Sequence, residues 1–110
     1  MGKGLERYIA RRKLEDVVQW NPDDVGVEEA RRHGESLHHL LWDIVEAVEE
    51  DKLLITEAVG QEILELVDRY YGFAVKAGGL EIQGDMSPED ARDGFKKVVE
   101  FNSRVQVVSR

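Results

Sequence analysis

Residues 37–48, LHHLLWDIVEAV, carry the clearest structural signal in the chain, because their large aliphatic side chains recur at the spacing of an α-helix. At about 100° per residue these side chains fall within one stripe about 140° wide. The stripe consists of Leu37, Leu40, Leu41, Ile44, Val45 and Val48. We therefore predict an amphipathic helix over about residues 27–50, with its apolar stripe packed on other helices.

Three further segments have helical spacing. Residues 5–20 carry two apolar groups that do not share a face, so this helix either bends near Arg12 or is contacted from two sides. Residues 56–77 carry an apolar surface broader than one neighbouring helix covers, and apolar residues recur at helical spacing from residue 88 onward. The chain thus contains four candidate helices.

The boundaries of these segments have local signals. Asn21-Pro22 and Ser87-Pro88 each combine a capping side chain with proline at a first helical position. Glycines at 78, 79 and 84 mark residues 77–86 as irregular. We predict an all-α fold, a four-helix bundle with a short irregular segment before the last helix, forming a single helical domain over residues 1–110.

Composition restricts the function. The 110 residues are 42% hydrophobic, enough for one packed core, and they include no cysteine, which excludes disulfides, thiolate metal sites and a cysteine nucleophile. The net charge of -8 opposes binding to nucleic acid and to anionic membranes. No apolar run is long enough to span a bilayer, and residues 1–13 lack the apolar stretch of a signal peptide. We expect a cytoplasmic protein.

The charges are segregated along the chain. The basic N-terminal segment, residues 1–13, has a net charge of +4, residues 43–68 have -8, and residues 92–110 have +3. We call residues 43–68 the acidic hairpin. Within one chain, the two basic ends would fold over this hairpin and offset the repulsion between its carboxylates. Between two chains, the basic end of one subunit would contact the acidic hairpin of the other. Both arrangements are compatible with the sequence.

Two acidic motifs occupy successive predicted helices. Glu46 and Glu49 form an E-x-x-E pattern, and Glu65 and Asp68 form an E-x-x-D pattern. Spacing of three residues puts two carboxylates on one helical face, and hard cations prefer oxygen ligands. This arrangement resembles the all-α nucleotide pyrophosphohydrolases of the MazG-like family, over residues 37–104. The resemblance implies that the four carboxylates hold Mg²⁺, which in turn binds a nucleoside triphosphate and activates water.

The helical wheel favours a different interpretation of these acids. Relative to the core stripes, the four carboxylates lie roughly 110–170° away, on the outer face of each helix. We therefore predict a solvated acidic face with no catalytic residue, no metal ligand and no cofactor. Mg²⁺ binding by Glu46, Glu49, Glu65 and Asp68 is the alternative.

Histidines and basic residues give weaker signals. Glu35-x-x-His38 is a single metal-binding motif, whereas a di-iron bundle needs two with further glutamates. His39 and Asp43 share an outer face and would need a partner's ligands to hold an ion. Tyr8 among basic neighbours is the one mixture of aromatic and basic residues suited to phosphate, so nucleic acid is disfavoured as a partner.

Four residues are candidates for an interface: Trp42, Leu64, Tyr71 and Val75. Trp42 lies at the border of the apolar stripe, where it either seals the bundle against the first helix or anchors a partner. The other three form a second apolar stripe, which either the first helix or another subunit covers. We predict a non-enzymatic protein that acts by protein–protein interaction or self-assembly, its partner being a second copy or another protein.

Overall fold

The computed structural model describes the backbone of residues 3–50, 52–79 and 87–108, and the side chains of 5–50, 52–79 and 87–102. These residues form four α-helices, α1 (Lys3–Arg12), α2 (Val27–Glu49), α3 (Glu57–Lys76) and α4 (Pro88–Val108). Two short 3₁₀ helices, η1 (Val17–Gln19) and η2 (Pro22–Asp24), lie between α1 and α2. The prediction of an all-α bundle is confirmed. Most of the predicted irregular segment, residues 80–86, lies outside the described residues.

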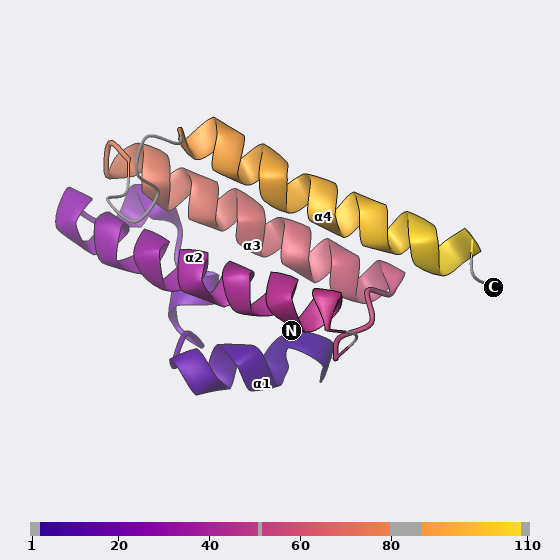
Figure 1. Cartoon of the computed structure of the whole chain (residues 1–110). Helices are drawn as coiled ribbons and strands as arrows, with labels where there is room; N and C mark the ends of the chain where they lie inside the picture. Colours follow the sequence, from indigo (N-terminus) through magenta and orange to yellow (C-terminus); the bar gives the residue numbers. More distant parts are fainter. Residues whose placement is uncertain (1–2, 51, 80–86, 109–110) are drawn as a thin grey trace.

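The α2–α3 hairpin is the centre of the molecule. α4 lies along α3 and also contacts α2, while α1 contacts α2 and α3 (Figure 1). The predicted α2 stripe is buried throughout, and on α3 the largest fully buried side chains are Tyr70 and Phe73. Among the helices described, none is long and apolar enough to cross a membrane.

The predicted helix over residues 5–20 is wrong beyond Arg12. Lys13 adopts a positive φ of 57°, and Leu14 N–H donates to Ile9 C=O at 3.1 Å, which closes α1 with a Schellman turn. Leu14 and Ile9 are both buried, so the turn is held by an apolar contact as well. The two apolar groups of this segment therefore lie on opposite sides of the turn, the first in α1 and the second in Leu14 and η1.

The other predicted boundaries agree with the structure more closely. The Ser87 hydroxyl accepts from Asp90 N–H at 3.1 Å at the start of α4, and the Thr56 hydroxyl accepts from Val59 N–H at 3.2 Å at the start of α3. Asn21 also caps a helix, but this helix is the 3₁₀ helix η2, not an α-helix. α3 ends where Gly78 and Gly79 adopt positive φ values of 76° and 104°.

Candidate functional site

An apolar groove lies between α2 and α4, with a volume of about 200 Å³. We call it the α2–α4 groove. α2 supplies His38, Trp42 and Val45, and α4 supplies Asp90, Ala91, Gly94, Phe95 and Val98. Apart from one histidine and one aspartate the lining is apolar, which is unusual for a surface hollow in a chain with 35% charged residues.

Aromatic rings form one wall of this groove. Trp42 meets Phe95 edge-to-face with ring centroids 5.8 Å apart, and Phe95 meets Tyr70 in the same way at 5.8 Å. His38 lies among them, 5.7 Å from Tyr70 and 5.9 Å from Phe95. Trp42 nevertheless keeps 48% of its surface exposed, so α4 covers only part of the indole.

A hydrogen bond links Trp42 to His38 across one helical turn. The Trp42 indole N–H donates to His38 Nε2 at 3.2 Å. Because an indole N–H is only a donor, Nε2 is unprotonated and neutral His38 carries its proton on Nδ1. That Nδ1 is buried and has no hydrogen-bond partner among the described residues. Burial lowers the pKa of His38 below its ordinary 6.5, and the neighbouring His39 lowers this pKa further.

Tyr70 lies deeper and is fully buried. Its hydroxyl has no partner within the part of the chain that the structure describes, and burial raises the pKa of the phenol above its usual value. The aromatic cluster therefore contains two buried polar atoms, on His38 and Tyr70, whose hydrogen-bonding capacity is unused.

Phe101 extends the apolar surface of the groove along α4. Its side chain is 66% exposed, the largest exposed fraction among the large hydrophobic side chains of the described residues. It follows Val98, which lines the groove, by nearly one helical turn. Phe101 therefore projects beside the apolar hollow instead of packing into the core.

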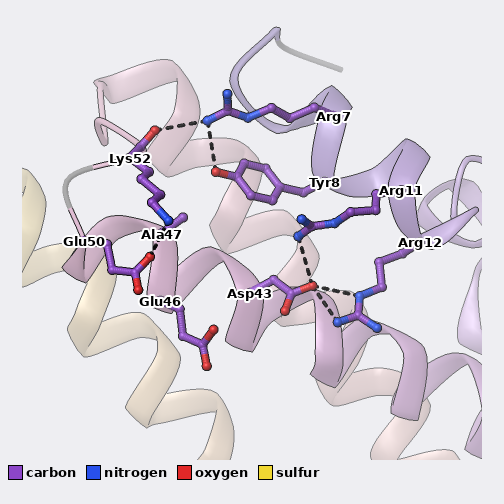
Figure 2. Close-up of a pocket in the computed structure, with 9 residues that line it drawn as sticks. All are labelled: Arg7, Tyr8, Arg11, Arg12, Asp43, Glu46, Ala47, Glu50 and Lys52. Carbon is purple, nitrogen blue, oxygen red and sulfur yellow. Dashed lines mark hydrogen bonds and ion pairs between the residues drawn. The ribbon is translucent and has the colours of Figure 1, made fainter.

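A second groove lies between α1 and α2, and it is larger and lined mostly by charged residues (Figure 2). We call it the α1–α2 groove. Its volume is about 980 Å³, and its lining consists of Arg7, Tyr8, Arg11, Arg12, Asp43, Glu46, Ala47, Glu50 and Lys52. Both signs of charge line it, so it is not a strongly positive or negative hollow.

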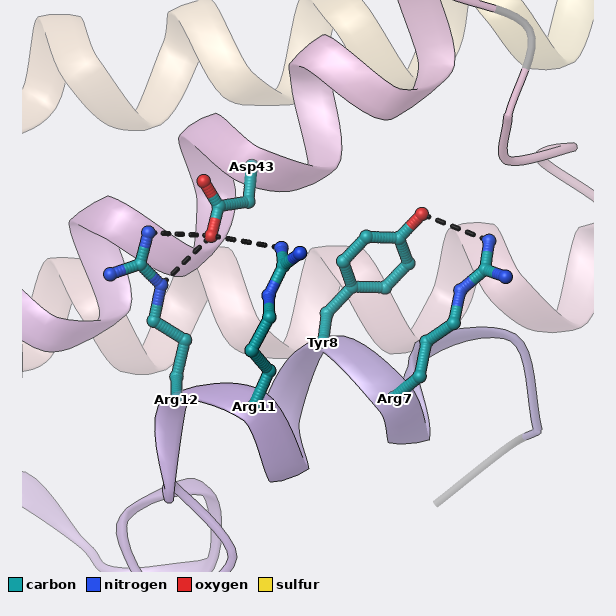
Figure 3. A network of polar contacts seen from close by, with 5 residues as sticks. All are labelled: Arg7, Tyr8, Arg11, Arg12 and Asp43. Atoms are coloured by element: carbon teal, nitrogen blue, oxygen red, sulfur yellow. Dashed lines mark hydrogen bonds and ion pairs between the residues drawn. The ribbon is translucent and has the colours of Figure 1, made fainter.

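Contacts within the chain occupy most of the charged groups of the α1–α2 groove. Arg12 donates to Asp43 at 2.8 Å through Nε, and Arg11 approaches the same carboxylate oxygen at 3.4 Å (Figure 3). Arg7 donates to the Tyr8 hydroxyl and to the Lys52 carbonyl oxygen, both at 3.0 Å. Residues 7–12 of the basic N-terminal segment thus contact residues 43–52 of their own chain.

The four carboxylates of the two acidic motifs are all exposed. Glu46 lies at the α1–α2 groove, and Asp68 pairs with Lys96 of α4 at 3.2 Å. The described residues contain no group of three or more histidine, aspartate or glutamate side chains placed to hold a metal ion. Within this part of the chain, the structure does not bring Glu46, Glu49, Glu65 and Asp68 together.

The four candidate interface residues have different surroundings. Leu64 is half-buried against the core, and the half-buried Tyr71 donates to Glu89 of α4 at 3.2 Å and lies under the guanidinium of Arg92. α4 therefore covers part of the second stripe of α3, for which the sequence had suggested either the first helix or another subunit. Val75 remains 49% exposed.

Trp42 packs on Phe95 of α4, a neighbour that the sequence did not suggest for it. Of the four candidates, it is the one that lines an apolar hollow.

Sequence reasoning did not identify Gly94 and Phe101. From residue 88 onward the apolar residues at helical spacing are Ala91, Phe95, Val98, Phe101, Val105 and Val108, and this spacing alone does not set Phe101 apart. Phe101 is six residues from Phe95, which is about 120° around the helix, and so it lies off the core-facing side. This angle is the signal that separates the exposed edge of α4 from its buried face.

Comparison with protein-family models, with curated proteins and with solved structures finds no match for the chain.

Proposed function

We propose that the protein acts by binding another protein chain through the α2–α4 groove and the adjoining Phe101, without a catalytic step. The observation that carries this proposal is an exposed phenylalanine beside an apolar hollow walled by a half-exposed tryptophan. Large aromatic side chains are enriched at the cores of protein interfaces, where their burial supplies much of the binding energy.

The second groove supports this choice by contrast. In the α1–α2 groove, Arg11 and Arg12 share the carboxylate of Asp43, and Lys52 pairs with Glu50. Most of the charged groups there already have partners within the chain, so little charge is left to recognise a ligand. In the α2–α4 groove, the exposed atoms are mainly apolar and gain free energy when a partner removes them from water. The exposed positions of the four carboxylates also support a non-enzymatic role over a magnesium-dependent one.

The proposal also places the protein in the cytoplasm, which agrees with a chain that has no cysteine and so forms no disulfide. Its partner is a protein, either a second copy or a different chain. The acidic net charge disfavours nucleic acid and anionic membranes as alternatives.

Photo-crosslinking in cells tests the proposal. A photoreactive phenylalanine analogue at position 101 is expected to yield a discrete product of higher mass that contains a second protein chain. The same analogue at Glu65, an exposed position on α3, is the matched control and is expected to yield none. If position 101 yields no protein adduct, or the same products as position 65, the α2–α4 groove is not a protein-binding surface.

A further inference from the structure

The face of α4 beside the α2–α4 groove carries both a projection and a hollow. Phe101 projects from it, and Gly94 forms part of the groove lining two turns earlier. Phe101 follows Gly94 by seven residues, which is about 10.5 Å along the helix and nearly two full turns. The two residues therefore lie at almost the same angle around α4. One helical edge therefore presents a large apolar side chain and, in line with it, a position with no side chain.

Among the described residues, none packs so closely on Gly94 that it requires a glycine there. A Cβ at this position would meet no atom within 4 Å, and the residue is not among those with positive φ. Gly72, in α3, differs sharply, since a Cβ there would lie 2.7 Å from the Pro22 ring. Glycine is disfavoured inside helices unless something approaches it closely. At Gly72 that approach comes from Pro22, whereas at Gly94 nothing in the described chain supplies it.

The hollow has the size and chemistry of a phenyl site. Its volume of about 200 Å³ exceeds the roughly 150 Å³ of an apolar cavity that accommodates benzene. Trp42 and Phe95 in its wall offer the edges and faces that aromatic rings prefer as neighbours. Phe101 of the same chain lies beside this hollow, too exposed to fill it.

We propose that the partner is a second copy of this chain, bound through an antiparallel α4–α4 contact in which each Phe101 enters the other copy's hollow over Gly94. This inference rests on the proposed function and names its partner. A twofold axis near Lys97 and Val98 places both Phe101 side chains opposite both glycines at once, as an isologous contact requires. The small residue at position 94 lets the partner's ring approach the helix backbone.

Charge distinguishes this contact from the other arrangement expected from the sequence. Arg11 and Arg12 already pair with Asp43 in their own chain, so these two arginines are not free to bind the acidic residues 43–68 of a neighbour. Two copies with a net charge of -8 each repel one another. Added salt therefore strengthens an apolar α4–α4 dimer, whereas it would weaken a contact between basic and acidic segments.

The first test is the mass of the purified chain by light scattering across a concentration series, with helicity followed in parallel. We expect the mass to rise from 12.6 kDa toward twice that value, with a lower midpoint concentration at higher salt. Phe101→Ala removes two contacts per dimer, each supplying about tenfold in affinity, so the dissociation constant rises about 100-fold.

Gly94→Leu separates a role in association from a role in folding. Leucine removes the glycine penalty in α4 and has space for its Cβ, so the monomer becomes more resistant to unfolding. The same side chain fills the hollow, so the dissociation constant rises at least tenfold. Val75→Glu is the matched control, because Val75 is exposed on α3 and lies far from the proposed contact. Val75 is one helical turn from Tyr71, and Tyr71 contacts Arg92 on α4. Arg92 lies roughly 160–180° around α4 from Gly94 and Phe101.

A single introduced cysteine tests the antiparallel geometry, because the chain has none of its own. Position 97 lies beside the twofold axis, so Lys97→Cys is expected to form a disulfide with the same position in the second copy. Position 93 lies too far from the same position in the second copy for Asp93→Cys to do so. Efficient oxidation of Asp93→Cys but not Lys97→Cys would overturn the geometry.

A monomeric mass at all concentrations, or dissociation by Val75→Glu but not by Phe101→Ala, would overturn the dimer. If that monomer still yields a heterologous crosslink at position 101, the proposed function stands and only this inference fails.

Discussion

The Tyr70 hydroxyl gives the sharpest test of the interior. Tyr70 is fully buried, and its hydroxyl has no hydrogen-bond partner among the described residues. A buried polar group without a partner costs about 1–3 kcal/mol of desolvation, whereas a phenyl ring in the same place costs none. We therefore expect Tyr70→Phe to raise the free energy of unfolding by about 1 kcal/mol. For a domain near this size the corresponding rise in Tm is roughly 4–8 °C.

Urea unfolding followed by circular dichroism, at one fixed protein concentration, measures this change as a shift in midpoint at constant slope. Tyr71→Phe is the matched control, because the half-buried Tyr71 donates to Glu89 at 3.2 Å. Removing that hydroxyl is expected to lower stability by about 0.5–1 kcal/mol. The two substitutions delete the same atom and should have opposite signs. A loss of 1 kcal/mol or more in Tyr70→Phe would refute the reasoning, since it would mean that the buried hydroxyl makes a stabilising hydrogen bond.

Three further outcomes are expected. Burial lowers the pKa of His38 in the folded chain, so as the pH falls the unfolded chain takes up its proton at a higher pH than the folded chain does. The contribution of His38 to stability is therefore full above pH 6.5 and falls as the pH drops below it. Urea midpoints on either side of pH 6.5 should therefore differ less in His38→Gln than in the native chain, and equal differences would contradict this. Lys13 and Gly78 both have positive φ, which glycine adopts more easily than other residues. Lys13→Gly should therefore raise the free energy of unfolding by about 0.5–1 kcal/mol, and Gly78→Ala should lower it by about 1 kcal/mol. Thermal midpoints of the two variants that shift in the same direction would argue against the turn geometry. The double variant Glu49→Gln, Asp68→Asn should stay within about 0.5 kcal/mol of the native chain, and calorimetry with Mg²⁺ and a non-hydrolysable nucleotide should give no binding heat. Nucleotide hydrolysis by the native chain that this variant loses would favour the pyrophosphohydrolase.

The fold was predictable from sequence wherever one apolar stripe faces one set of neighbours. In α2 the six-residue stripe is buried as expected, because its period matches the helix and no competing apolar face exists. The end of α1 was not predictable, since the chain turns at Lys13 and a lysine gives no signal for a positive φ. The backbone hydrogen bonds of the turn and the burial of Leu14 and Ile9 explain why the chain keeps a lysine with positive φ here.

The candidate site was predictable only in part. Trp42 was singled out from its place at the border of the stripe, but its neighbour could not be deduced. Which helix lies across from it depends on how α4 is placed on the hairpin, and local spacing does not encode that placement. Leu64 and Tyr71 formed a surplus stripe on α3 in sequence, and contacts with the core and with α4 account for part of it. Spacing alone does not show which of several apolar stripes a distant helix covers.

Two residues of α4 remain unfavourable in the isolated chain. Gly94 costs about 1 kcal/mol relative to alanine in a helix interior, and its Cβ position is open. Phe101 leaves 66% of its surface in water, although burying such a side chain is worth roughly 1.5–3 kcal/mol. Alanine at 94 and a polar residue at 101 would suit a solitary chain better. Because the two residues lie on one helical edge, a single covering partner can bury Phe101 and use the close approach that Gly94 allows, which offsets both costs. This is the physical reason to look for the function of the protein on that edge.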